Sequence, residues 1–167
     1  MQIDVTPILE AGTDKVGFSF DWEVPDGLYE DKSFPEPVHV AGNVVNRSGY
    51  MFLTLNAKVK YRTQCARCLS ELEREYTFDL TKNVALDKDV SDEDDDVAVI
   101  VGSGIEMDEP LEELLFLELP SRDLCKEDCA GLCPKCGANL NKGDCGCEKK
   151  EIDPRLAVLK KYLDNNN

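Results

Sequence analysis

Cysteine is the residue type with the clearest chemistry in this chain, and it is strongly clustered. Six of the 8 cysteines lie in the stretch CKEDCAGLCPKCGANLNKGDCGC, and the other two form CARC further upstream. CARC and CPKC are Cys-x-x-Cys pairs, whose thiolates can converge on one cation from a tight turn, and Zn²⁺ takes four such ligands in a tetrahedron. Gly137 follows the second pair and can adopt the positive φ that lets the turn wrap around a metal. The predicted ligands for one or two zinc ions are therefore Cys65, Cys68, Cys125, Cys129, Cys133, Cys136, Cys145 and Cys147.

The eight cysteines can be divided between two sites in more than one way. The favoured division places Cys133, Cys136, Cys145 and Cys147 in one local site with C-x2-C-x8-C-x-C spacing. Such a short segment can fold largely on the free energy of metal binding. The upstream pair would then join Cys125 and Cys129 in a long-range site. A rival division combines the upstream pair with Cys133 and Cys136, and spacing alone leaves it open.

Other uses of the thiols are less consistent with the sequence. After CARC the alternation of a strand resumes, whereas a redox Cys-x-x-Cys usually opens a helix. A cysteine nucleophile usually needs a basic partner, and the single histidine, His39, lies in a valine-rich strand. The chain also lacks a phosphate-binding loop with its lysine. We therefore expect a protein that is not an enzyme, with no catalytic residue and no small-molecule substrate.

The chain start and composition favour the cytoplasm. MQIDVTPILEAG has neither a basic n-region nor a long apolar run, and no stretch approaches the roughly 18 apolar residues of a membrane span. We therefore expect no signal peptide and no membrane association. In a reducing cytoplasm, clustered cysteines bind metal more often than they form disulfides, which remain the alternative.

Net charge limits the possible partners. A formal net charge of -15 disfavours general binding to nucleic acids, because a uniformly acidic surface is repelled by phosphates. Lys58, Lys60 and Arg62 nevertheless share one face of a predicted strand and could contact phosphates. A solvent-exposed face without a ligand is the simpler explanation of this stripe.

Hydrophobic patterning predicts a β-rich first part of the chain. Residues 37–65 contain the clearest hairpin, with a turn at 46–49 and strict alternation from Met51 to Tyr61. Strands are also expected at 72–84 and 97–101, on either side of an acidic loop at 87–96. A helix near 109–118, capped by Asp108, follows the last of these strands. Asp153 and Pro154 begin a second helix.

These elements define the expected architecture. The fold class is α+β, with an antiparallel, partly barrel-like sheet, a packed helix, a Cys-rich zinc module and a C-terminal helix. A β-rich core domain would span residues 1–124, the zinc module 125–150, and the C-terminal helix and tail 151–167.

The same features together resemble a known family. The chain has CARCL at the end of a strand, then an acidic loop, DEPLEELLFLELP, GLCPKCGANLN with CGC, and DPRLAVLK. This combination resembles the YceD-like family of large ribosomal RNA subunit accumulation proteins. The resemblance matches the upstream pair to Cys65 and Cys68, and the downstream positions to Cys125 and Cys129.

The resemblance implies a cytoplasmic, non-catalytic factor that supports 23S rRNA accumulation and biogenesis of the large ribosomal subunit. The expected partners are pre-ribosomal 23S rRNA, a basic large-subunit ribosomal protein, or both. The alternative function is a redox-regulated, zinc-dependent holdase chaperone, because thiols that bind zinc can release it on oxidation.

Overall fold

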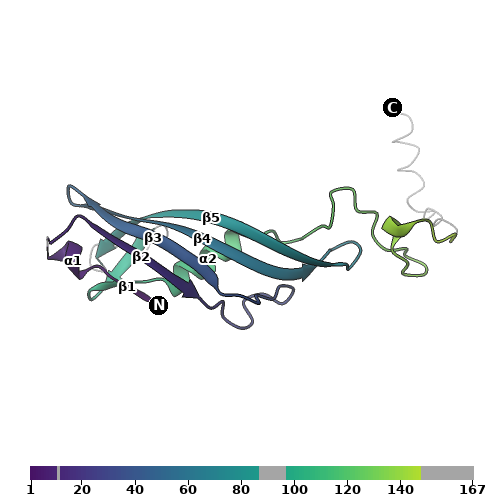
Figure 1. The fold of residues 1–167 in the computed structure, drawn as a ribbon, viewed down its shortest axis with the longest axis horizontal. Coiled ribbons are helices and arrows are strands. Elements are labelled where there is room, and N and C mark those ends of the chain that lie inside the picture. Colours follow the sequence, from purple (N-terminus) through teal and green to yellow (C-terminus); the bar gives the residue numbers. More distant parts are fainter. Residues whose placement is uncertain (11, 87–96, 148–167) are drawn as a thin grey trace, which may run out of the picture.

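The part of the chain that the structure describes folds around one large sheet with two α-helices. The structure is a computed structural model, and it describes residues 1–10, 12–86 and 97–147. In chain order its elements are β1 (Gln2–Asp4), α1 (Thr6–Leu9), β2 (Lys15–Trp22), β3 (Val38–Arg47), β4 (Tyr50–Gln64), β5 (Glu71–Leu86), β6 (Val97–Val101), β7 (Gly104–Glu106), α2 (Asp108–Glu118) and the short 3-10 helix η2 (Leu140–Lys142). The sheet occupies one end of an elongated molecule, and the cysteine-rich segment extends from the other end (Figure 1).

The sheet is a mixed, nearly closed barrel of seven strands in the order β1-β7-β6-β5-β4-β3-β2. Its centre is the long antiparallel β4–β5 hairpin. The pairing of these two strands begins with Met51 opposite Val84 and ends with Gln64 opposite Glu71. The expected β-rich, barrel-like α+β fold is confirmed, with one difference in strand direction. β5 and β6 are parallel, with Asn83 opposite Val97. A parallel neighbour requires a crossover connection, and alternation within each strand carries no information about that direction.

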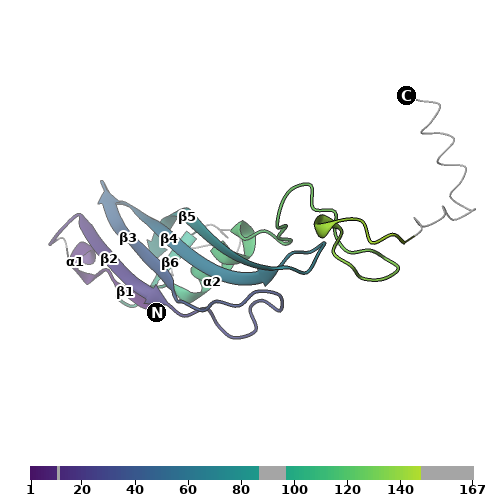
Figure 2. The ribbon, with the colours of Figure 1, turned by 45° about the vertical axis from the view of Figure 1, so that its right-hand side comes forward.

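Alternation along β4 correctly predicts the buried face of the sheet. Leu53, Leu55, Ala57, Val59 and Tyr61 are all buried, while the residues between them are exposed or only half-buried. α2 lies along one side of the sheet in both views (Figures 1 and 2). It contributes Leu111, Leu114 and Leu115 to the same core. This apolar stripe therefore holds the helix to the sheet.

The start of α2 differs from the sequence prediction. Met107 is the N-cap residue and makes no side-chain capping bond, while Asp108 is the first residue of the helix. The Asp108 carboxylate instead accepts a hydrogen bond of 2.7 Å from the Trp22 indole N–H. Asp108 therefore binds a side chain of β2 and does not make the helix cap that the sequence predicts.

Some predicted segments lie outside the described residues. They are the acidic loop 87–96, residues 148–150 of the zinc module and the C-terminal helix and tail 151–167. Among the helices of the described residues, none is long and apolar enough to cross a membrane. The domain boundaries stay a prediction.

Candidate metal centres

The first group of thiols, here called the inner cluster, joins two distant parts of the chain. It contains Cys65, Cys68, Cys125 and Cys129. The first two lie in the turn between β4 and β5, and the other two follow α2. The turn is closed by hydrogen bonds from the Cys65 N–H to the Ser70 carbonyl and from the Leu69 N–H to the Cys65 carbonyl, each 2.9 Å long. The hairpin therefore delivers both thiols to one point at its end.

The sulfur spacing of the inner cluster fits a tetrahedral ion. The Sγ atoms of Cys65 and Cys129 are 3.7 Å apart, and those of Cys68 and Cys125 are 3.6 Å apart. All four Sγ atoms lie within 4.8 Å of one another. Four sulfurs at the Zn–S distance of about 2.3 Å would be separated by about 3.8 Å. The inner cluster could therefore hold one metal ion with little rearrangement.

Hydrogen-bond donors around the inner sulfurs favour thiolates. Burial acts to raise the pKa of Cys65, but backbone N–H groups of Cys125, Arg67 and Cys68 lower it to about 6. A hydrogen bond with the Ser70 hydroxyl, at 3.2 Å, lowers the pKa of Cys68. Sharing of a proton with Cys129 raises the pKa of Cys125 to about 12. Without a cation the four sulfurs therefore share protons. A divalent ion that binds them would displace these protons.

The second group, the outer cluster, is formed within one short segment. It contains Cys133, Cys136, Cys145 and Cys147, again with all sulfur atoms within 4.8 Å. The Gly137 N–H donates to the Cys133 carbonyl at 2.8 Å, and Gly137 has a φ of +74°. That positive φ is the conformation expected of a glycine after a metal-binding pair. Cys133 is buried and Cys136 is exposed, so the outer cluster is the more accessible of the two.

Short polar bridges connect the two clusters. The Asn141 side chain, from η2, donates to the Cys129 sulfur at 3.3 Å and to the Asn139 side-chain oxygen at 2.9 Å. Its own side-chain oxygen accepts from the Ala130 N–H at 2.9 Å. η2 lies between the ligand pairs of the outer cluster and thus also supports a ligand of the inner cluster. Such outer-shell donors orient metal ligands and tune their basicity.

A buried charge network anchors the segment that carries Cys125. Asp123 is 5% exposed and accepts hydrogen bonds of 3.0 and 3.1 Å from the Tyr61 hydroxyl. Its carboxylate also lies 3.7 Å from Arg74 and 4.0 Å from the buried Lys32. The Asp123 carbonyl accepts from the Ala66 N–H at 2.9 Å, inside the CARC turn. Asp123 thereby joins the sheet, the loop that carries Lys32 and the CARC turn.

Two nearby cations, Arg67 and Lys126, are engaged by oxygen atoms. Arg67 donates to the backbone carbonyls of Cys129 and Glu127, at 3.1 and 3.3 Å. Lys126 pairs with Asp128 at 3.7 Å. Arg67 therefore fastens the two ligand-bearing segments together by fixing backbone.

The predicted basic stripe lies on the exposed face of β4, and each of its cations is paired. Lys58 lies 2.9 Å from Glu75, Lys60 lies 3.1 Å from Glu36, and Arg62 lies 3.3 Å from Glu73. The β4–β5 register places Arg62 directly opposite Glu73 and Lys58 diagonal to Glu75, whereas the closest partner of Lys60, Glu36, lies outside β5. These carboxylates compete with any phosphate for the three cations.

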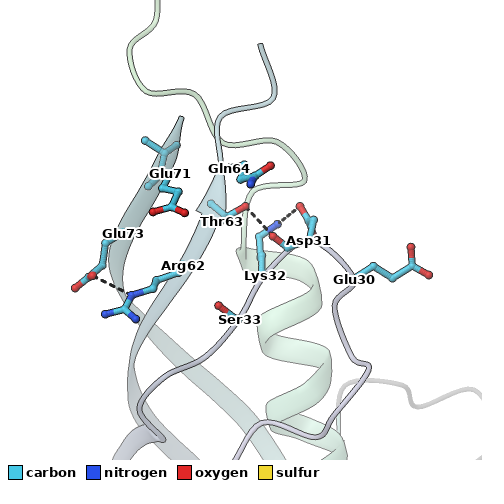
Figure 3. A pocket seen from close by; sticks show the side chains of 10 residues that line it. Glu30, Asp31, Lys32, Ser33, Arg62, Thr63, Gln64, Glu71 and Glu73 are labelled. Carbon is cyan, nitrogen blue, oxygen red and sulfur yellow. Dashed lines mark hydrogen bonds and ion pairs between the residues drawn. The ribbon is translucent and has the colours of Figure 1, made fainter. Parts of the chain in front are cut away.

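A cavity of 810 Å³ lies beside the stripe, near the end of the β4–β5 hairpin. Figure 3 shows Arg62 directed toward Glu73, and Lys32 directed toward Asp31, among the residues that line it. Four of its lining residues are acidic: Glu30, Asp31, Glu71 and Glu73. Small-molecule sites are mostly apolar with a few placed polar groups, so this cavity does not have the character of such a site.

The structure brings the eight cysteines together in the division that their spacing favours. The rival set, which combines the upstream pair with Cys133 and Cys136, is not formed. Sequence reasoning missed Asp123, Lys32 and Asn141. A buried carboxylate two residues before Cys125 has no periodic signal in the sequence, because its partners come from strands far away in the chain.

Comparison with known proteins identifies a matching family profile. A profile described as "Large ribosomal RNA subunit accumulation protein YceD" matches residues 53–163, which include all eight cysteines. No solved structure matches the chain significantly.

Curated relatives support the same match. The uncharacterized protein Rv2926c of Mycobacterium tuberculosis is 37% identical over 103 residues, covering 60% of this chain and 49% of the relative. The uncharacterized protein YlbN of Bacillus subtilis is 28% identical over 156 residues, covering 89% of this chain and 90% of the relative. An Arabidopsis thaliana protein named as a chloroplastic YCED homolog 1 is 38% identical over 55 residues, covering 33% of this chain and 17% of the relative. The chain thus spans about half the length of the mycobacterial relative.

Proposed function

Because the chain belongs to the YceD family of large ribosomal RNA subunit accumulation proteins, we propose that it is a zinc-binding, non-enzymatic factor that supports accumulation of 23S rRNA and biogenesis of the large ribosomal subunit. Its partners would be precursor 23S rRNA, a basic large-subunit ribosomal protein, or both. The observation that carries the zinc part of the proposal is the inner cluster. It joins the β4–β5 turn to the segment after α2, with sulfur spacings of 3.6 and 3.7 Å.

Zinc suits both clusters better than magnesium or calcium does. Four thiolates in a tetrahedron are typical of structural zinc sites, whereas magnesium and calcium take oxygen ligands. An all-thiolate site leaves no open position for a substrate. The bound ions would therefore stabilise the fold, and the sequence offers no catalytic group beside them.

Metal analysis tests this part directly. Protein purified under reducing conditions should contain two zinc ions per chain by mass spectrometry of the metal content, one for each set of four thiols. Cys68→Ser and Cys136→Ser should each lower that content by one ion. Leu69→Ser, an exposed neighbour of Cys68, is the matched control and should retain both ions. Metal-free protein with an unchanged melting temperature would reject the zinc proposal.

The ribosomal role needs a measurement in cells. Deletion of the encoding gene should lower the amount of 23S rRNA relative to 16S rRNA. Wild-type protein should restore the ratio, and Cys65→Ser, which breaks the inner cluster, should not. An unchanged rRNA ratio after deletion would overturn the ribosomal proposal, whatever the metal content.

Contact with RNA through Lys58, Lys60 and Arg62 is a separate part of the proposal. Glutamine is the appropriate replacement, since glutamate at these positions would face Glu73 and Glu75. If the stripe contacts RNA, the triple glutamine variant should lose ultraviolet crosslinking to precursor rRNA. Unchanged crosslinking would show that the stripe serves only in cross-strand ion pairs.

One observation favours the redox-regulated holdase as a second candidate. Cys136 is exposed and Cys145 and Cys147 are half-buried, so an oxidant can reach the outer cluster. Mild peroxide should then eject zinc, expose apolar surface to a fluorescent dye and suppress aggregation of a denatured client protein. Zinc loss without client protection would exclude this function.

A further inference from the structure

α2 carries two large apolar side chains on its outer face. Phe116 and Leu117 are each 70% exposed, although Leu114 and Leu115 directly before them are buried in the core. Both views show α2 lying along one side of the sheet, so its other side faces outward (Figures 1 and 2). Adjacent exposed phenylalanine and leucine side chains are costly in water and often mark an interaction site.

The surroundings of this pair are acidic. Three glutamates lie on the same face of α2 as Phe116, because helical spacing brings residues three, four and seven positions apart together. Glu109 precedes Phe116 by two turns, and Glu112 and Glu113 precede it by one turn. Among the described residues, only Glu113 of these three has an ion-pair partner, Lys82 at 2.7 Å. α2 itself contains no basic residue. The outer face thus combines an apolar pair with three carboxylates.

We propose that this outer face of α2, defined by Glu109, Glu112, Glu113, Phe116 and Leu117, binds a basic segment of a partner protein. Apolar side chains of that segment would pack on Phe116 and Leu117, and its lysine or arginine side chains would face the carboxylates. The proposal rests on the proposed function, which calls for a basic large-subunit protein as a partner. It adds the surface on which that partner would bind.

Charge complementarity is the reason for choosing this occupant. Pairing of the face with a second copy would bring the same carboxylates together, in a protein with a formal net charge of -15. Like charges brought together at an interface disfavour association. RNA would meet the same repulsion. A cationic segment with apolar side chains would interact favourably with both the carboxylates and the apolar pair of this face.

The binding test uses the full zinc-loaded chain and labelled synthetic peptides. The first probe is an 18-residue amphipathic peptide with leucine on one face and lysine beside it. The second has glutamate in place of lysine, and the third has serine in place of leucine. We expect fluorescence anisotropy to show binding of the first probe only, weakened at least about tenfold by 500 mM salt because the charges are exposed.

Surface variants then locate the binding. Phe116→Ser with Leu117→Ser should weaken binding of the first probe at least tenfold, and Glu109→Lys with Glu112→Lys should do the same. Tyr50→Ser is the matched control, because Tyr50 is 74% exposed but lies at the start of β4. Unfolding curves check that the variants remain folded. Equal binding by wild type and the Phe116/Leu117 variant, or binding of the glutamate probe, would overturn the proposal.

Two other occupants give distinct results. If a second copy covers the face, wild-type protein will sediment as a dimer that the Phe116/Leu117 variant converts to a monomer. If residues 148–167 cover it, the full chain will not bind the first probe, and the chain without those residues will bind it. Either result would overturn the proposal. A monomer with the same probe affinity before and after truncation supports it.

The in-cell assay separates this inference from the proposed function. If gene deletion lowers 23S rRNA and the Phe116/Leu117 variant restores it fully, the binding face is wrong while the ribosomal role stands. If deletion leaves 23S rRNA unchanged, the ribosomal role fails, and the peptide measurements still decide whether the face binds basic segments.

Discussion

The individual thiols in each cluster differ in how readily they lose a proton. Backbone N–H donors lower the pKa of Cys133 to about 6, with the N–H groups of Cys136 and Lys135 as the main cause. Sharing of a proton with Cys136 raises the pKa of Cys147 to about 12. The inner cluster shows the same contrast between Cys65, at about 6, and Cys125, at about 12. Each cluster thus has at least one thiol with a pKa below neutral pH and one thiol with a pKa far above it.

The affinity for zinc should therefore rise with pH, since protons compete with the ion. Above pH 6, Cys65 and Cys133 are ionised, and the ion displaces protons chiefly from their partners. Below that pH both are protonated, and each ion must displace about one more proton. Calorimetric titration with zinc in two buffers of different ionisation enthalpy measures this number. A proton count that is the same at pH 5 and pH 7 would contradict the assignment of the low-pKa thiols.

Gly131 is a second residue whose role can be isolated by one substitution. It has a φ of +74°, and a Cβ added there would lie 3.1 Å from the Arg67 carbonyl oxygen. Gly137 has the same φ but no atom within 4 Å of the equivalent position. Alanine costs conformational strain of about 1 kcal/mol or more at either site. At Gly131 the alanine side chain would in addition push the CARC turn away from the segment that carries Cys129, which it would not do at Gly137.

Gly131→Ala should therefore lower the melting temperature and the affinity of the inner cluster for zinc more than Gly137→Ala does. Chemical unfolding of the zinc-loaded protein measures the first effect, and competition with a chromophoric chelator measures the second. Equal effects of the two substitutions would show that strain alone decides the cost and that the close approach to Arg67 is unimportant.

At the scale of elements, Asp123 is the main connection between the sheet and the segment after α2. The side chains of Asp123 and Lys32 are 3% and 2% exposed, and the Tyr61 hydroxyl donates to the carboxylate. Burial of the Tyr61 ring and the bond to Asp123 both raise the pKa of Tyr61. The tyrosine therefore stays a neutral donor across the accessible pH range.

Asp123→Ala should lower the free energy of unfolding by about 3 kcal/mol, because it removes a buried carboxylate that Tyr61, Arg74 and Lys32 share, and leaves the buried Lys32 with only the exposed Asp31 as its ion-pair partner among the described residues. Tyr61→Phe removes only one hydrogen bond and should cost about 1 kcal/mol. Urea unfolding followed by the single tryptophan, Trp22, measures both. If the two substitutions cost the same, the carboxylate serves only as an acceptor for Tyr61 and the buried ion pair contributes little.

The sequence predicted the elements whose signal is local and periodic. Alternation in β4 and β5, the leucine stripe of α2 and the turn before Tyr50 all have the predicted positions. It could not predict the parallel β5–β6 pair or the buried partners of Asp123, because these depend on which distant segments meet. The cysteine spacing predicted the two groups of thiols for a different reason: the two thiols of a short Cys-x-x-Cys loop can converge on one point, so both belong to the same group.

At the scale of the whole molecule, the two clusters have different relations to the folded core. The inner cluster closes a link between residues more than 50 positions apart and lies directly beyond the sheet. The outer cluster lies farther from the sheet, in the segment that extends from it (Figure 1). In the described residues the outer segment is connected to the inner one mainly by the Asn141, Gly131 and Leu140 contacts.

Metal removal should therefore proceed in two steps. The outer cluster has the exposed Cys136 and no apolar core of its own, so a chelator should remove its ion first, with loss of structure confined to that segment. The inner ion should leave more slowly, because Cys65, Cys68 and Cys129 are buried. Its loss removes one of the connections between the β4–β5 turn and the chain after α2, and the contacts of Asp123, Arg67 and Arg74 then have to hold that segment without the ion.

Hydrogen exchange read by mass spectrometry can follow these steps while a chromophoric chelator reports the zinc released. After release of the first ion, exchange should increase in 131–147 and remain unchanged in β4 and β5. After the second, it should increase at the CARC turn and at 123–129, while the centre of the hairpin stays protected by its strand pairing. In Asp123→Ala the second step should come earlier and extend further into β4. Simultaneous release of both ions with exchange throughout the sheet would mean that the two metal sites and the core form a single cooperative unit.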